Sequence, residues 1–291
     1  MKKGCFVGLA GLDILFHVDK MPKENNKAKA NEYVTHIGGP AANAAITYTM
    51  LGGKATLITS IGDSPLGKSL KLELEEYGVE VLDVASGQSD LPSISSIAIN
   101  DTNGSRTILS GQRSIIGDID NEIFDELDTS LFCLSDCNLF ELSKKTVEAA
   151  KNRNIPVVLD AGNWKDGFEF FMSNADYTIA SSVCKAPYDD DLFKVAFDCG
   201  SKNVAITNGE KETKWSDEKR SGTIHTKRVK AFDTLAAGDI FHGAFCYYKF
   251  VDNLGFEQAL INANEVATYS VMFEGPRMGI VEYLKNIKNI Y

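Results

Sequence analysis

Short apolar runs alternate with amphipathic segments along most of this chain. The apolar runs have the length of buried strands, and the segments between them carry apolar residues at helical spacing. This alternation favours an α/β fold in which helices cover both faces of a mostly parallel sheet. The predicted core strands are 4–10, 55–61, 80–84, 130–134, 155–160, 176–180 and 203–207. The predicted helices are 40–51, 65–77, 119–127, 142–153, 166–174, 188–198, 238–250, 255–273 and 279–289.

Two regions break this alternation. Residues 12–36 and 93–110 each contain two extended segments with turn signals such as Asn103-Gly104, and neither has a helix between its segments. We expect these four strands to form a small second sheet, a lid attached to the main one. No repeat, low-complexity tract or linker divides the sequence, so residues 1–291 are predicted to form one domain that includes the lid.

Composition narrows the class of partner. The 291 residues are 44% hydrophobic and 24% charged, which is ordinary for a globular protein. The net charge of −10 disfavours nucleic acid and anionic membranes, since both attract basic surfaces. The six cysteines are scattered, as in proteins with reduced thiols, and no stretch approaches the ~20 apolar residues of a spanning helix. We therefore expect a cytoplasmic protein without a nucleic-acid or membrane partner.

Residues 233–245, Asp-Thr-Leu-Ala-Ala-Gly-Asp-Ile-Phe-His-Gly-Ala-Phe, place a carboxylate in the first turn of a predicted helix. The first amide groups of a helix lack intrahelical partners and carry the positive end of its dipole, so they attract anions. The small residues Ala236, Ala237 and Gly238 leave room for a phosphate beside them. A base, Asp239, next to an anion site is what phosphoryl transfer to a hydroxyl requires. The segment predicts a kinase of a small alcohol.

A second segment, Gly62-Asp-Ser-Pro-Leu-Gly67-Lys68-Ser69, matches the P-loop pattern of ATPases and GTPases between a predicted strand and a helix. In that interpretation, Asp160 at the end of predicted strand 155–160 would be the acidic residue that binds the metal ion. However, Pro65 removes one amide from a loop that works by presenting amides, and a P-loop leaves Asp239 unexplained. The other interpretation, which we favour, is a strand-to-helix turn that Gly62 permits and Pro65 opens.

Together with Gly38-Gly39-Pro-Ala-Ala-Asn43-Ala, the two segments resemble the ribokinase-like (PfkB) family of carbohydrate kinases. That family has an N-terminal Gly-Gly signature, which often continues into Leu-Gly and Gly-Asp, and a C-terminal Asp-Thr-x-Gly-Ala-Gly-Asp signature. The likeness covers essentially the whole chain. It implies a Rossmann-like domain with a β lid, the cofactors ATP and Mg²⁺, a candidate K⁺ site, and homodimers that pair through their lids.

Within the family, two branches look most similar. Asp13, residues 19–24 and residues 103–108 are similar to the ketohexokinase pattern, whereas residues 241–244 and 275–280 look more like sulfofructose kinase. The sulfofructose branch carries an Arg at about the position of Asn138, and its absence here removes the natural clamp for a sulfonate. The resemblance therefore predicts ATP-dependent phosphorylation of a ketohexose, such as fructose or a modified fructose.

The resemblance also implies roles for individual residues. Asp239 would be the general base, with the backbone of Ala236, Ala237 and Gly238 holding the phosphoryl oxygens. Asp13, which follows the first strand at the ligand-binding edge of the sheet, suits a polyol because a carboxylate accepts from two vicinal hydroxyls. The full set of implied substrate residues is Asp13, Gly38, Gly39, Asn43, Arg106 and Asn25. The implied nucleotide residues are Thr207, Gly209, Asn264 and Gly275, and Asp233 is the candidate monovalent cation site.

Two departures from the family pattern keep other functions open. The family usually has Gly where Ala236 stands, and a methyl group there is harmful only if the residue needs a positive φ. Residues 181–184, Ser-Ser-Val-Cys, replace an Asn-x-x-Glu motif linked to Mg²⁺. The alternatives are a nucleoside kinase on the same fold and a catalytically weakened sugar or nucleotide sensor. The four histidines, His17, His36, His225 and His242, are predicted to be packing or surface residues.

Overall fold

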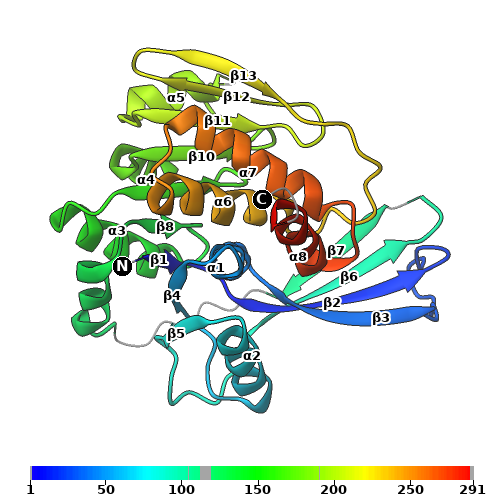
Figure 1. The fold of residues 1–291 in the computed structure, drawn as a ribbon. Coiled ribbons are helices and arrows are strands. Elements are labelled where there is room, and N and C mark those ends of the chain that lie inside the picture. The colour runs from blue at the N-terminus through cyan, green and yellow to red at the C-terminus, as the bar shows by residue number, and fades with distance from the viewer. Residues whose placement is uncertain (1, 104, 112–118, 190, 289–291) are drawn as a thin grey trace.

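A nine-stranded sheet forms the centre of the computed structural model, which describes residues 2–103, 105–111, 119–189 and 191–288 (Figure 1). Its strand order is β13-β12-β11-β10-β9-β8-β1-β4-β5, and neighbours pair in parallel from β5 to β11. The strands are β1 (Lys3–Val7), β4 (Lys54–Thr59), β5 (Val79–Asp83), β8 (Cys133–Ser135), β9 (Val157–Ala161), β10 (Tyr177–Ser181), β11 (Asn203–Thr207), β12 (Glu212–Asp217) and β13 (Ser221–His225). The predicted mostly parallel core is confirmed.

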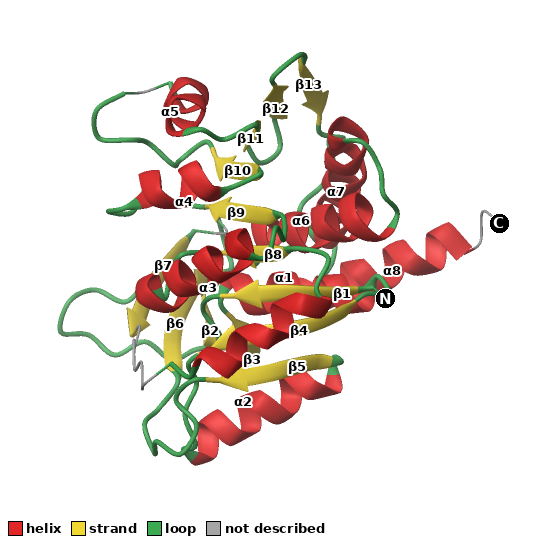
Figure 2. Cartoon of the chain, turned by 90° about the vertical axis from the view of Figure 1, so that its left-hand side faces the viewer, coloured by secondary structure: helices red, strands yellow, loops and turns green. Residues whose placement is uncertain are grey.

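Helices cover both faces of this sheet (Figure 2). One layer consists of α1 (Pro40–Met50), α2 (Pro65–Glu76), α6 (Ala237–Cys246), α7 (Phe256–Ser270) and α8 (Gly275–Lys288). The other consists of the 3₁₀ segment η1 (Asn121–Thr129), α3 (Phe140–Asn152), α4 (Phe168–Asn174) and α5 (Leu192–Cys199). A π-type turn, η2 (Tyr247–Val251), continues α6.

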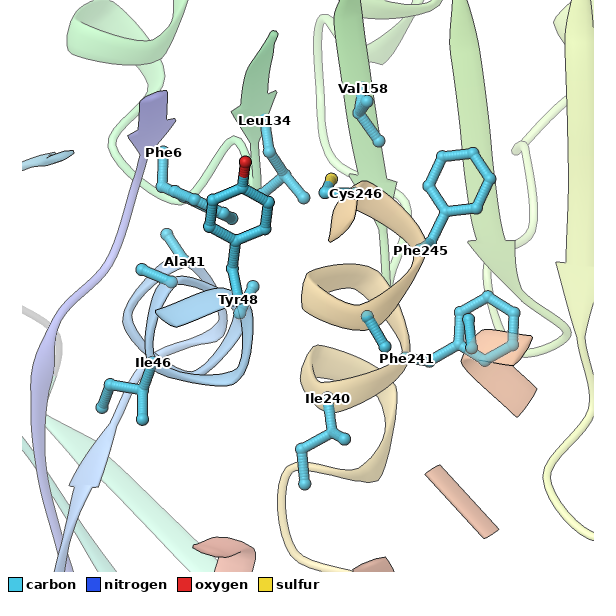
Figure 3. Packing of buried hydrophobic residues seen from close by; sticks show 14 of the residues in the cluster. Phe6, Ala41, Ile46, Tyr48, Leu134, Val158, Ile240, Phe241, Phe245 and Cys246 are labelled. Carbon is cyan, nitrogen blue, oxygen red and sulfur yellow. The ribbon is translucent and has the colours of Figure 1, made fainter. Parts of the chain in front are cut away.

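Two hydrophobic cores lie on opposite faces of the sheet because successive strand residues point to opposite sides. In β1, Phe6 belongs to the core under α1 and α6, whereas Cys5 and Val7 belong to the core under α3 and α4. Tyr48 of α1 packs its ring 5.5 Å from that of Phe6, and Figure 3 shows α1 and α6 side by side over these strands. Gly243 of α6 lies directly against α1, since a Cβ on it would be 2.3 Å from the carbonyl oxygen of Ala44, so the two helices pack closely.

A separate four-stranded sheet, the lid, has the order β3-β2-β6-β7 and projects from the main sheet (Figure 1). Its strands are β2 (Gly11–Val18), β3 (Glu32–Gly38), β6 (Ser93–Asn100) and β7 (Arg106–Gly111). Asp13 of β2 lies between His36 of β3 and Ser95 of β6 in the sheet register. The expected small second sheet is therefore confirmed, with Gly104 of its predicted turn outside the described residues.

Several predicted boundaries were wrong. The hairpin strands β12 and β13, the last two at one end of the sheet, were not predicted, because each has a single large apolar residue among polar ones and they pair antiparallel. The predicted helix 119–127 is 3₁₀, a geometry that places Phe124 and Leu127, three residues apart, on one buried face. Helix α8 begins at Gly275 rather than at 279, since Pro276 is tolerated in a first turn.

Glycine at position 279 also has a packing reason. A Cβ there would lie 2.4 Å from Ser270 Cα, so glycine lets α8 approach α7 closely. Within the described part of the chain, no helix is both long enough and apolar enough to cross a membrane.

Candidate active site

The Gly-Gly turn leads from the lid into α1. Gly39 has φ of 95°, and a Cβ on it would lie 2.2 Å from the carbonyl oxygen of Leu9, so only glycine fits. The buried carboxylate of Asp136, at the end of β8, accepts hydrogen bonds from the backbone N–H groups of Leu9 (3.0 Å) and Ala41 (3.1 Å). These two hydrogen bonds fix the Gly-Gly turn. Asn43, in the first helical turn of α1, then faces α6.

The second signature forms the turn before α6. Ala236 is left-handed, with φ of 56° and ψ of 14°, so it occupies the position where a non-glycine residue costs roughly 1–2 kcal/mol. Asp233 braces the turn by accepting from the N–H of Leu235 (2.9 Å) and from that of Gly275 at the start of α8 (3.0 Å). Alanine thus replaces the glycine usual in the family at a position whose positive φ makes a methyl group unfavourable.

Asp239 lies in the first turn of α6 and is partly buried. Its Oδ2 accepts a hydrogen bond of 2.9 Å from Asn43 Nδ2. Burial, followed by the nearby carboxylate of Asp160, raises the pKa of Asp239 to about 7, while the Asn43 hydrogen bond and His242 act in the opposite direction. A carboxylate with such a pKa accepts a proton far more readily near neutral pH than an ordinary aspartate does.

A pocket of about 490 Å³ opens at this helix start. It extends from Ala237, Gly238 and Asp239 to the turn after β11 and to one side of α7. Thr207, Gly209 and Asn264, the predicted nucleotide residues, all line it. Lys227 and Arg228 line it as well, which gives the pocket cationic groups in a protein of net negative charge.

The predicted sugar residues gather at the junction of lid and α1. A Cβ on Gly38 would lie 2.4 Å from Asp13 Oδ1, so the carboxylate occupies the space that a side chain at 38 would need. Burial raises the pKa of Asp13, and a hydrogen bond with Ser95 opposes that shift. Asp13, Gly38, Gly39, Asn43 and Asp239 therefore form one connected group, which runs from the lid to the pocket.

Three other predicted residues lie elsewhere. Arg106 of β7 donates a hydrogen bond to the hydroxyl of Thr234, a pocket-lining residue, so the lid contacts the signature turn. Asn25 is exposed in the connection between β2 and β3 and does not line the pocket. Gly275 is bonded to Asp233 rather than lining the pocket. The contacts predicted for Asn25 with sugar and for Gly275 with nucleotide stay predictions.

Two pocket residues, Asp160 and His242, had no role in the sugar-kinase interpretation of the sequence: Asp160 was considered only as the acidic residue of a P-loop protein, and His242 was predicted to be a packing or surface residue. Asp160 ends β9 and His242 follows Asp239 by three residues on α6; His242 Nδ1 lies 3.4 Å from Asp160 Oδ2 and 2.7 Å from the carbonyl oxygen of Gly238. Burial raises the pKa of Asp160, and His242 opposes this. The available signals were the carboxyl-edge position of Asp160 and the i, i+3 spacing on one helix face.

The P-loop interpretation fails on geometry. The amides of Ile61 and Gly62 donate to the carboxylate of Asp83, at 2.8 and 2.9 Å, and that of Gly67 donates to Ser64 Oγ at 3.1 Å. Pro65 opens α2 and Gly62 has φ of 85°. These amides already have partners inside the protein, so the segment is a strand-to-helix turn.

Comparison with known proteins agrees with this geometry. The profile of the pfkB family of carbohydrate kinases matches residues 1–280, and the chain belongs to that family. A deoxyribokinase from Salmonella typhi is 25% identical over 283 residues, with 92% of each chain covered. The protein is thus a sugar kinase, an enzyme that transfers a phosphoryl group to an alcohol.

Solved structures share the fold. A putative ribokinase from Agrobacterium tumefaciens superposes with a TM-score of 0.84 at 24% identity, covering 99% of this chain and 98% of its own. An Arabidopsis thaliana ribokinase complexed with ribose and ATP gives 0.74 at 20% identity, with coverage of 97% and 98%. A mouse ketohexokinase is 30% identical, but over only 43% of this chain and 42% of its own. That partial match gives weak support to the expected ketohexokinase likeness.

Proposed function

We propose that this protein transfers the γ-phosphoryl group of ATP to a sugar hydroxyl, with Asp239 as the general base. The observation that carries the proposal is the placement of Asp239, which starts a helix, lines the pocket and is bonded to Asn43 of the Gly-Gly helix. The carboxylate takes the hydroxyl proton while the sugar oxygen attacks the γ-phosphorus, and the bond from phosphorus to the bridging oxygen breaks to release ADP.

The start of α6 would stabilise the charge that spreads over the transferring group. The backbone amide of Gly238 lies in the first turn of the helix, where N–H groups lack intrahelical acceptors, whereas that of Ala237 donates to the carbonyl oxygen of Thr234 at 3.4 Å. Both residues line the pocket beside Asp239. Base and anion site therefore lie in the same helical turn, which suits in-line transfer between a hydroxyl and a terminal phosphate.

Mg²⁺ fits this site without a cage of protein ligands. Magnesium usually keeps several waters and reaches a protein through one or two carboxylates plus substrate phosphates. Apart from Asp239, the described carboxylates lining the pocket are those of Asp160 and Glu210, and either could take that part. When bound, the ion would neutralise phosphate charge. The family-typical Glu is absent at residues 181–184, so we assign no further ligand there.

For the acceptor we propose a neutral ketohexose, such as fructose or a modified fructose. The half-buried carboxylate of Asp13 beside the glycine turn suits two vicinal hydroxyls, and glycine at 38 keeps the approach open. A pentose is the second candidate, because the deoxyribokinase that resembles this chain does so over 92% of both lengths. Both acceptors present a hydroxymethyl group to the base.

We further propose a homodimer formed through the lid, and Asp233 as a K⁺ site. Three large apolar side chains of the lid are exposed, namely Tyr33 (69%), Ile108 (56%) and Leu109 (72%). The register places Tyr33 and Leu109 on one face of the lid and Ile108 on the other, and exposed apolar groups that share a sheet face are typical of an interface. Asp233 accepts two backbone hydrogen bonds, which leaves lone pairs on its carboxylate for a cation.

A coupled assay of ADP production tests the function. We expect Mg²⁺-dependent ATP consumption with fructose or a modified fructose, compared in parallel with ribose, deoxyribose and adenosine. Asp239→Asn should lower kcat by about 10²- to 10⁴-fold, since the amide cannot accept the proton. Sugar binding, measured by calorimetry, should persist in that variant.

The outcomes separate the alternatives. Turnover with adenosine alone would favour a nucleoside kinase, and sugar binding without any turnover would favour a sensor. Full activity of Asp239→Asn would remove the base from this proposal. The base must be ionised to act, so with its pKa near 7 the rate should fall about tenfold per pH unit below pH 7.

A further inference from the structure

Helix α8 places a guanidinium next to Asn43, the residue whose side chain donates a hydrogen bond to the proposed base, Asp239. Arg277, in the first turn of α8, places Nη2 2.6 Å from Oδ1 of Asn43. The other end of the same amide, Nδ2, lies 2.9 Å from Oδ2 of Asp239. Three helices, α1, α6 and α8, therefore meet at a single amide group that is 3% exposed.

The chemistry of the two outer groups leaves this amide one orientation. A guanidinium has only donors and an ionised carboxylate has only acceptors, so the amide oxygen must face Arg277 and the amide nitrogen must face Asp239. We infer that Arg277 is a positioning residue for the base: it fixes Asn43 so that its N–H group donates to Asp239 Oδ2. The inference rests on the proposed function, in which Asp239 is that base.

The guanidinium is itself held in place. It lies over the ring of Tyr77, with the Cζ of Arg277 5.5 Å from the ring centroid, and its Nη1 is buried with no hydrogen-bond partner among the described residues. Burial lowers the pKa of Arg277 to about 10, so it stays charged at neutral pH, and the nearby Tyr77, Asp239 and Glu73 favour that charge. His36 of the lid also faces it.

The hydrogen bond from Asn43 counteracts the effect of the nearby acidic groups on the pKa of Asp239. Burial raises the pKa of Asp239, as do Asp160 of β9 and Asp136 just after β8, whereas Asn43 of α1 and His242 on its own helix lower it. Without Arg277, the amide of Asn43 could turn its oxygen toward Asp239, an arrangement that only the protonated acid tolerates. The base would then be protonated over more of the neutral range and would lose its fixed direction toward the acceptor.

The test is Arg277→Met, which keeps most of the side-chain length and removes every donor. With the best acceptor from the sugar panel, we expect kcat at pH 7 to fall about 10- to 100-fold, the cost of a misdirected catalytic group. The acid limb of the kcat profile should move to higher pH by about one unit. A role in folding alone would not move that limb in the protein that remains folded.

Two further variants guard the interpretation. Arg277→Lys keeps a charged donor, so it should recover part of kcat and return the limb toward the wild-type value; it also carries the test if Arg277→Met does not fold. Arg220→Met is the matched control, because Arg220 lies over the ring of Trp215 at the same 5.5 Å but in the β12–β13 hairpin. It should leave kcat and the pH profile unchanged.

The possible results are distinguishable. A wild-type protein that phosphorylates nothing in the panel would refute the proposed function, whatever Arg277 does. An active wild type together with an Arg277→Met variant of unchanged kcat and acid limb would refute the positioning role. A higher KM for the sugar with unchanged kcat would also overturn it, and would instead put the guanidinium on the substrate.

Discussion

Two glycine-rich turns, at residues 38–43 and 62–68, each lead into a helix, but only the first belongs to the proposed active site. In both, a proline stands at the start of the helix and a buried aspartate from the end of a neighbouring strand accepts the amides of the turn. The first turn adds Asn43, whose side chain meets Asp239, and a position 38 that faces Asp13. The second adds Lys71, which pairs at 2.6 Å with both Asp63 and Asp83.

The comparison teaches that glycine spacing alone does not identify a ligand site. The amides of the second turn have the right sequence for phosphate, but the protein's own carboxylate and hydroxyl oxygens occupy them. The first turn takes its proposed role from side chains that its helix and the lid bring together, rather than from free amides. The chemistry of such a turn therefore depends on the side chains that pack against it.

Substitution of the glycine in the first turn should have the largest effect. In Gly39→Ala the new methyl group meets a backbone oxygen 2.2 Å away at a φ of 95°, so we expect a loss of about 3 kcal/mol in unfolding free energy. The activity should fall with it, because Asn43 follows in the same helix. Gly62→Ala, with its methyl group 2.9 Å from a backbone oxygen, is the paired control. Equal kcat values in the two folded variants would contradict the comparison.

The carboxylate under the second turn should matter for stability alone. Asp83→Ala leaves the amides of Ile61, Gly62 and Ala85 without their acceptor and the ammonium of Lys71 with Asp63 alone. We expect a loss of about 2–3 kcal/mol in chemical denaturation, with kcat at a permissive temperature unchanged. A selective loss of ATP binding in the folded variant would revive a nucleotide role for this turn.

A smaller gain is expected at the signature turn. Ala236→Gly removes the penalty of a methyl group at a φ of 56°, and should raise the unfolding free energy by about 1 kcal/mol, or Tm by roughly 2–4 °C. Differential scanning calorimetry measures the shift. An unchanged or lower Tm would mean that the turn holds alanine without strain.

The smallest effect is expected for Lys68→Ala. This lysine is exposed on α2, and in a true P-loop it would be the residue that binds phosphate. We expect KM for ATP and kcat to remain at wild-type values in the steady-state assay. A large rise in KM for ATP would contradict the assignment of this turn.

The sequence predicted the parts that depend on local pattern. All seven core strands, the lid and the placement of Asp239 at a helix start follow from periodicity and from small residues before a helix. The hairpin β12–β13 could not be recognised, because each strand has a single large apolar residue, Trp215 or Ile224, and its pairing is set by β11. The role of Asn43 in binding sugar stays a prediction. Its bonds to Asp239 and Arg277 join positions 196 and 234 residues apart, a relation that only the packed helices create.

Gly38 and Gly39 are neighbours, yet they constrain future variation of this enzyme differently. A side chain at 39 would meet the main chain of Leu9 and Ala10, whereas the nearest atoms to one at 38 belong to the side-chain carboxylate of Asp13. Changes at 38 should therefore be survivable for the scaffold while they alter the cavity in which the acceptor would rest. Natural or engineered substitutions at position 38 could therefore change the preferred acceptor without requiring further changes that restore folding.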